Sequence, residues 1–232
     1  MHKKHSLLFF FFLVSFYCYS QKKTNQQQVD SVAYYMNNAK GVNKLYYLKK
    51  AVDLAQEIEN DSLIRKTNIK FGIQSYFKRD TLGLFIAKNN LKNLYDKSLD
   101  SFALAKELHF KALIHRIQYK IDSSFYYYHQ SKNISILIKD SLEVGKRFLS
   151  MARMQEGEKD YLGSQITTIE ALKYIEPLKE YIFTSSLYNN LGIVMMEMKN
   201  YNEAIKYYKK AKKIKQLNPS VNRRKTTELN IL

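Results

Sequence analysis

The fold of this chain is decided by the stretch "LYNNLGIVMMEMKNYNEAIKYYKKAKKI", residues 187–214. Its small residues Gly192, Ala204 and Ala211 stand among bulky neighbours. Stepping back from Gly192 in intervals of 40 residues reaches, in turn, Ala152, Ala112, Gly72 and Val32. Only the last of these is not small, and self-similarity at a fixed period is the signature of a repeat architecture.

The other small residues repeat at the same interval. Steps of 40 residues lead from Ala211 to Ala171, Ser131, Leu91 and Ala51, and from Ala204 to Ser164, Ser124, Leu84 and Lys44. Large residues keep this interval at Tyr208, Thr168 and Tyr128, with Thr168 the smaller exception, and again at Tyr201, Tyr161 and Ile121. The repeat is clear in the last three intervals and decays toward the N-terminus.

A small side chain lets two antiparallel helices approach closely, and a large side chain of the partner helix fills the space. One such pair cannot bury its own apolar face, so the pairs must stack. The triplets that begin at Asp61, Asp100 and Asp140 indicate helix N-caps, because Asp and Ser accept the free N–H groups of a first turn. The sequence therefore predicts an all-α α-solenoid of antiparallel helix pairs, with a 40-residue period and about five units.

This spacing resembles the tetratricopeptide repeat (TPR) family, whose signature runs from a bulky residue through Leu-Gly and an aromatic to Ala, an aromatic and Ala. The matching residues of the last unit are Tyr188, Leu191, Gly192, Tyr201, Ala204, Tyr208 and Ala211. Those of the two units before it are Phe148, Met151, Ala152, Tyr161, Ser164 and Ala171, and Leu108, Ala112, Ile121, Ser124, Tyr128 and Ser131. The resemblance implies three clear TPR units over residues 100–219 and degenerate TPR-like helix pairs over 21–99.

Residues 1–20 have the layout of a cleaved secretory signal peptide. A basic start precedes the apolar run "LLFFFFLVSFY", and small residues around Ser20 mark a cleavage point. The alternatives are an uncleaved anchor, for which the apolar run is short, and lipidation at Cys18, against which the large Tyr17 counts. We expect an exported protein, periplasmic or envelope-associated, with no transmembrane helix after signal cleavage and no cysteine.

No catalytic, cofactor or metal motif occurs in the sequence. The chain lacks the nucleotide-binding, zinc-protease and nucleophile-elbow patterns. After cleavage its histidines are His109, His115 and His129, and without cysteine a structural zinc site is disfavoured. The paired carboxylates Glu156 and Glu158 lie near an expected helix end, where nothing would tune their pKa values for acid–base work. We expect no enzyme activity, no cofactor and no metal.

The resemblance to TPR proteins implies a concave groove, lined by the first helix of each pair, that binds a protein or peptide partner. The residues expected to form this partner-binding groove are Lys66, Tyr76, His109, Arg116, Lys146, Arg153 and Asn189. The TPR subgroup that grips C-terminal carboxylates needs a Lys and an Asn one turn apart, and that pair is absent here. We therefore expect a non-enzymatic exported TPR scaffold whose partner differs from that subgroup's ligand.

Positive charge concentrates near the C-terminus. The formal charge is +17, which falls to +15 without Lys3 and Lys4. The candidate basic patch comprises Lys206, Lys209, Lys210, Lys213, Arg223 and Arg224, and residues 220–232 are expected to form a basic C-terminal tail or capping helix. Such a field attracts polyanions, although the same lysines suit the solvated outer face of a terminal repeat.

The alternative function is therefore a peripheral envelope protein that binds anionic lipid through this basic face. Nucleic acid is disfavoured, because an exported protein rarely meets it. A secretory signal followed by such repeats also resembles the sensor half of envelope TPR-containing regulators. That resemblance implies a third function, an orphan sensor module of a transcriptional regulator or histidine kinase.

Overall fold

The structure is a computed structural model that describes residues 26–218. The predicted signal peptide, residues 1–20, and the predicted tail, residues 220–232, lie outside the described residues, and Arg223 and Arg224 lie there with the tail.

Within residues 26–218 the chain is helical and contains no strand. A first helical stretch covers residues 26–38. It is followed by η1 (Gly41–Asn43), α2 (Lys44–Glu57), α3 (Asp61–Phe77), α4 (Thr81–Ser98), α5 (Ser101–Ile117), α6 (Ile121–Leu137), α7 (Ser141–Gly157), α8 (Tyr161–Ile175), η2 (Glu176–Leu178), α9 (Tyr181–Glu197) and α10 (Tyr201–Leu217). These make five helix pairs, which confirms the predicted all-α fold.

The helices keep an interval of 20 residues because the backbone turns at the same place each time. Among the described residues the non-glycine positions with positive φ are Glu59, Arg79, Leu99, Tyr119, Lys139, Lys159, Lys179 and Lys199, with φ from 50° to 63°. At Arg79 the N–H donates to the Tyr76 carbonyl, and the N–H of Asp80 donates to the Ser75 carbonyl at 2.8 Å. Such left-handed residues close a helix, at a cost of about 1–2 kcal/mol without glycine.

At six of these eight left-handed positions the next residue caps the following helix with its side chain, whereas Lys120 and Glu180 make no such bond. Side-chain oxygens accept the N–H three residues on at Asn60, Asp80, Asp100, Asp140, Asp160 and Asn200. Asp100 and Asp140 are thus the caps that the sequence predicts. The prediction is wrong by one residue at Asp61, which is the first helical residue of α3, because Asn60 supplies the oxygen.

The chain divides into two compact units at Leu94 and Tyr95, within α4. In the first unit, buried side chains of α2, α3 and α4 form the apolar core, including Leu48, Phe71 and Leu91. The amide Nδ2 of Asn90 on α4 donates to Oδ1 of Asn68 on α3 at 2.9 Å, which links these two helices.

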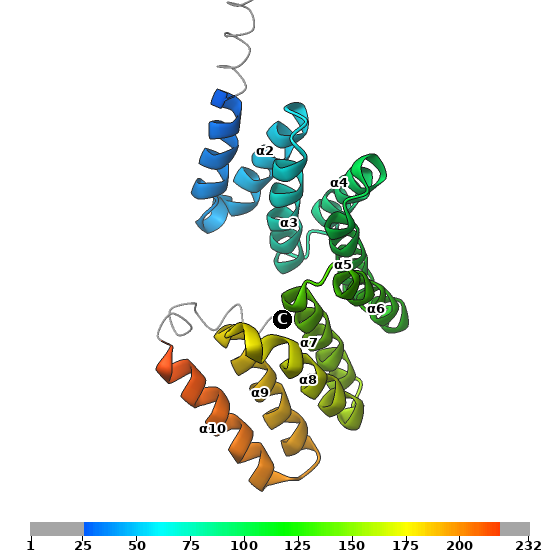
Figure 1. The fold of residues 1–232 in the computed structure, drawn as a ribbon, viewed down its shortest axis with the longest axis vertical. Coiled ribbons are helices and arrows are strands. Elements are labelled where there is room, and N and C mark those ends of the chain that lie inside the picture. The colour runs from blue at the N-terminus through cyan, green and yellow to red at the C-terminus, as the bar shows by residue number, and fades with distance from the viewer. Residues whose placement is uncertain (1–25, 219–232) are drawn as a thin grey trace, which may run out of the picture. The chain divides into compact units, whose positions relative to one another are not determined.

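The second unit stacks three helix pairs, and Figure 1 shows α7, α8, α9 and α10 side by side in chain order. A methyl group at Gly192 on α9 would overlap the ring of Tyr208 on α10, so the small residue makes room for the large one as predicted. In the pair α5–α6, hydroxyl groups also link the two helices. Ser124 donates to the Ala112 carbonyl at 2.9 Å and Ser131 to the Ala105 carbonyl at 2.7 Å, holding both helices at short range.

Among the described residues, no helix combines the length and the apolar character that crossing a membrane requires.

Candidate functional site

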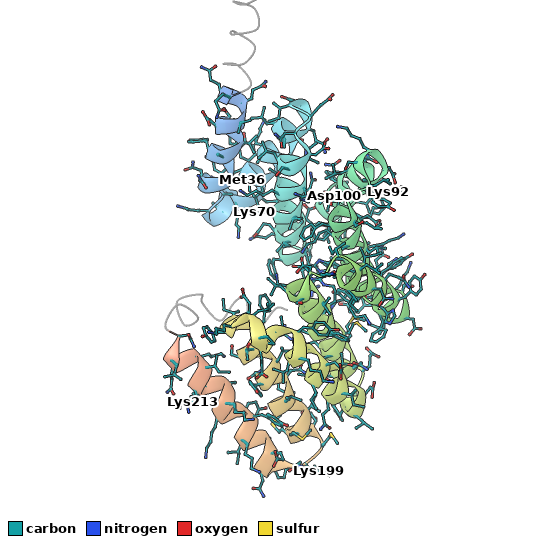
Figure 2. The ribbon with its side chains drawn as sticks, in the orientation of Figure 1. Met36, Lys70, Lys92, Asp100, Lys199 and Lys213 are labelled. Carbon is teal, nitrogen blue, oxygen red and sulfur yellow. The ribbon has the colours of Figure 1, made fainter. Side chains whose placement is uncertain are left out.

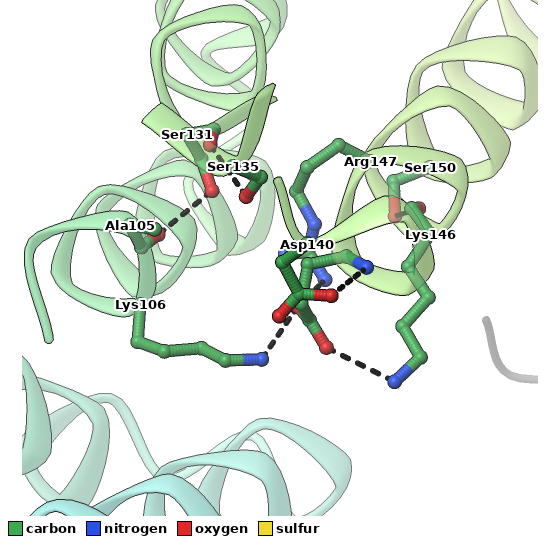
Figure 3. A network of polar contacts seen from close by, with 9 residues as sticks. Ala105, Lys106, Ser131, Ser135, Asp140, Lys146, Arg147 and Ser150 are labelled. Carbon is green, nitrogen blue, oxygen red and sulfur yellow. Dashed lines mark hydrogen bonds and ion pairs between the residues drawn. The ribbon is translucent and has the colours of Figure 1, made fainter. Parts of the chain in front are cut away.

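Two first helices of the second unit, α5 and α7, carry a cluster of charged side chains (Figure 3). We call Lys106, Glu143, Lys146 and Arg147 the ion cluster. The Glu143 carboxylate is its centre. It forms an ion pair with Lys106 Nζ of α5 at 2.5 Å. On its own helix it also pairs with Lys146 Nζ at 3.0 Å and with Arg147 Nη2 at 3.3 Å. The bond from Lys106 to Glu143 joins α5 to α7, which belong to separate pairs of the stack.

Burial and charge set the protonation states of the cluster. Burial lowers the pKa of Lys106 from 10.5 to about 8, although Glu143 opposes this shift. Burial alone would raise the pKa of Glu143, but Arg147, Lys106 and Lys146 together hold it well below its usual range. Burial, with Arg147 and Lys106, holds the pKa of His109 well below 6.5. At pH 7 the cluster therefore contains one carboxylate, three cations and a neutral imidazole beside them.

Arg147 is the least satisfied member of the cluster. Its side chain is 4% exposed, and within the described residues its Nε and Nη1 atoms have no hydrogen-bond partner. A buried donor without an acceptor is destabilising, and in a native structure it calls for an explanation such as a ligand. Lys146 is the most open member, with 24% of its side chain exposed.

The predicted groove residues fall into three places. His109 and Lys146 lie at the ion cluster, since both cluster lysines and Arg147 act on the pKa of His109. Arg116 and Arg153 are half-buried in the C-terminal halves of α5 and α7, and Asn189 is half-buried on α9. Lys66 and Tyr76 lie on α3 in the first unit. The structure brings together His109 and Lys146, whereas nothing relates Lys66 and Tyr76 to them.

Sequence reasoning missed Lys106, Glu143 and Arg147. One available signal was the register, since Lys106 and Lys146 are 40 residues apart and occupy the same place in successive first helices. Lys146 also lies over the ring of Phe183 on α9, with 5.0 Å between Nζ and the ring centre, so the contacts of these two lysines extend from α5 to α9.

The described part of the predicted basic patch lies on α10. Lys206, Lys209, Lys210 and Lys213 are all exposed, and Figure 2 shows Lys213 on this helix with Lys199 just before its start. Lys206 pairs with Glu203 at 2.5 Å, and Lys210 lies over the ring of Tyr188 at 5.1 Å. These lysines form one strongly positive outer surface of the last helix.

A pocket of about 400 Å³ lies between α6 and the end of α7. It is lined by Ile121, Asp122, Phe125, Tyr126, His129, Met154, Gln155, Glu158 and Asp160, and shares no residue with the ion cluster. The sequence analysis did not predict it. Among residues 26–218 no group of His, Cys, Asp and Glu side chains is arranged to hold a metal ion.

Comparison with known proteins gives a likeness of fold. No protein-family model and no curated protein matches the sequence. The solved structure of BtubC (BKLC) from P. vanneervenii is similar with a TM-score of 0.59 at 13% identity, covering 84% of this chain and 91% of that one. A kinesin light chain structure from Podospora anserina, with nearly identical TPR-like repeats, has a TM-score of 0.55 at 11% identity, covering 84% and 96%. Together with its own helix pairs, these similarities show that the chain folds as a TPR-like helical-repeat solenoid.

Proposed function

We propose that this chain is a non-enzymatic exported scaffold that binds a protein or peptide partner across its first helices α5, α7 and α9. TPR-like repeats generally mediate protein interactions, because stacked repeats present an extended surface that a single compact domain lacks. Export remains part of the proposal and rests on the sequence of residues 1–20.

The observation that carries the proposal is the unfilled hydrogen-bonding capacity of Arg147 beside the partly exposed Lys146. Three cations share the Glu143 carboxylate, with the Asp140 carboxylate as the next anion acting on Arg147. The cluster therefore keeps an excess positive charge in a site of low exposure, where electrostatic attraction is stronger than in water. An acidic side chain of a partner would meet Lys146 first and could accept from Arg147 behind it.

The test is capture of a partner from envelope extract by the chain immobilised on resin. Lys146→Ala removes a lysine from the first-helix face. Lys173→Ala is the matched control, because Lys173 also pairs with a glutamate three residues before it but lies on the second helix α8. We expect a discrete protein to be retained by the wild type and the control at low and moderate salt, and to be lost from Lys146→Ala and from Arg116→Glu. Equal capture by all four proteins, at unchanged helicity, would contradict the proposal.

The second candidate function, binding of anionic lipid, is favoured by the outer surface of α10. Exposed lysines there alternate with exposed apolar side chains, among them Tyr201, Ile205 and Leu217 at 60%, 51% and 69% exposure. A helix with cationic and apolar exposed residues suits the surface of an anionic membrane. This function predicts binding to phosphatidylglycerol vesicles that weakens steeply with salt and is lost in Lys209→Glu/Lys213→Glu. Salt-insensitive binding, or none, would reject it.

The third function, an orphan sensor module, stays a prediction from the resemblance to envelope regulators. Copurification of the chain with a membrane protein that carries an output domain would support it.

A further inference from the structure

The pocket between α6 and the end of α7 has a chemistry opposite to that of the chain around it. Asp122 lies in the first turn of α6, and Glu158 and Asp160 follow the last turn of α7, so carboxylates come from both sides. The chain as a whole has a formal charge of +17. Lys120 and Lys159 are adjacent in the sequence to residues that line the pocket, but they do not line it themselves. A local group of carboxylates in a basic protein marks a place that attracts a cation.

The repeat does not require acids at these positions. At the position equivalent to Asp122 the preceding unit has Leu82, and the two following units have Leu162 and Asn202. In place of Glu158 the other units have Lys78, Gln118 and Met198. Since those units form the same helix pairs without the carboxylates, packing of the solenoid does not explain Asp122 and Glu158.

Both carboxylates are available to a ligand. Within residues 26–218 neither the Asp122 carboxylate nor the Glu158 carboxylate makes a hydrogen bond or an ion pair. Asp160, in contrast, is occupied, because it caps α8 through the N–H of Gly163 and accepts from Gln155 Nε2 at 3.1 Å. The remaining oxygen of that amide, Gln155 Oε1, is buried and has no partner among the described residues. A buried acceptor of this kind is satisfied by an incoming N–H donor.

The lining of the pocket offers aromatic surface to a cation. Phe125 and Tyr126 line it, and Tyr126 is 57% exposed. Elsewhere the chain covers such rings with its own lysines, as with Lys111 over Tyr127 at 4.5 Å. In the described part of the chain no lysine lies over Phe125 or Tyr126. Burial and Lys132 lower the pKa of His129, so at neutral pH this side chain adds an uncharged ring.

We propose that this pocket binds an arginine side chain of a protein partner. A guanidinium group is planar, stacks on aromatic rings, and carries five N–H donors, which suits rings flanked by two carboxylates and an amide oxygen. A lysine ammonium group would use the charge but not the planar stacking. A polypeptide partner is indicated by exposed apolar side chains beside the pocket in the sequence, Tyr119 at 80% and Leu162 at 62% exposure, which a larger ligand would cover.

The methyl group of Met154 gives a direct readout of the pocket. The full chain is labelled with carbon-13 at its methionine methyl groups, and Met154 is assigned by its absence in Met154→Leu. The probe is the peptide acetyl-Gly-Arg-Gly-amide, and the control peptide has citrulline, the uncharged shape analogue of arginine. We expect the Met154 signal to move saturably with the arginine peptide, in the millimolar range or tighter, and at least about tenfold more weakly with citrulline.

Variants that remove negative charge distinguish binding in the pocket from a general effect of the protein's net charge. Asp122→Asn/Glu158→Gln should weaken arginine binding by about tenfold or more. Glu170→Gln/Glu203→Gln makes the same change of charge at partly exposed glutamates outside the pocket, and should leave binding unchanged.

The proposal is overturned if the arginine peptide does not move the Met154 signal, or if citrulline binds equally well. Binding of tetramethylammonium without binding of the arginine peptide would also overturn it, because it would indicate a site for a small free cation. The pocket shares no residue with the ion cluster or with the predicted groove residues, so loss of partner capture by Lys146→Ala can be observed whether or not arginine binds here.

Discussion

Replacing Glu143 with glutamine removes the one carboxylate on which the ion cluster is centred. Glu143 accepts from three cations, and the side chains of Lys106 and Arg147 are only 8% and 4% exposed. Glutamine has nearly the same shape, so the variant tests charge and not volume. It leaves Lys106, Lys146 and Arg147 without their shared anion. A buried charge that loses its partner strongly destabilises the folded protein.

The expected loss is large because the partners are buried. Removing one partner of a buried pair costs about 3–5 kcal/mol, and for a chain of this size each kcal/mol lowers the melting temperature by about 2–4 °C. We therefore expect Glu143→Gln to lower Tm by about 6–20 °C. Glu170→Gln is the matched control, since Glu170 also bonds a lysine three residues later but with 40% and 62% of the two side chains exposed. An exposed pair contributes less than about 1 kcal/mol.

The assay is urea unfolding and thermal unfolding followed by far-ultraviolet circular dichroism. A second variant, Lys106→Met/Glu143→Gln, should be more stable than Glu143→Gln alone, because it removes one of the unpaired charges. The reasoning is refuted if Glu143→Gln and Glu170→Gln have the same stability, which would mean that the ion cluster is solvated.

Three further predictions follow from the helix contacts and the cluster. Gly192→Val should lose about 1–3 kcal/mol by overlap with the Tyr208 ring, whereas Gly157→Ala, which meets nothing within 4 Å, should lose nothing in the same urea assay. Lys139→Gly should gain up to about 1 kcal/mol by relieving a left-handed residue with φ of 58°, and a loss of stability would contradict that explanation of the turns. The pKa of Lys106 is about 8 in the folded state and 10.5 in the unfolded state, so the unfolded state binds more protons between these two values. Over this pH range the contribution of Lys106 therefore makes wild-type stability rise with pH. The Tm difference between the wild type and Lys106→Met should change over this range and not below it.

The interval of the repeat could be predicted from side-chain size, because closely packed helices need small residues opposite large ones. Gly192 and Tyr208 are an example, since the ring occupies the space that the missing side chain leaves. The left-handed residues that enforce the 20-residue interval could not be predicted, because the positions hold Glu59, Arg79, Leu99, Tyr119 and four lysines in place of glycine. Nothing in such residue types indicates a positive φ.

The candidate sites were harder to predict, since each depends on residues from different helices. Lys106 and Glu143 meet only because α5 and α7 have a particular rotation, and the sequence interval between them does not reveal it. The pocket is harder still. Asp122 and Gln155 lie on successive helices, and their register positions in the other units hold different chemistry, so the repeat pattern that predicts the fold gives no signal for this site.

The most direct test of the central claim, binding of a protein partner across the first helices, is site-specific photocrosslinking. A benzophenone amino acid is placed at Lys146 on the first helix α7 or at Lys173 on the second helix α8, and each protein is irradiated in envelope extract. The account predicts a discrete protein adduct from position 146 that persists at moderate salt, and no such adduct from position 173. Equal adducts from both positions, or an adduct from position 173 alone, would contradict it.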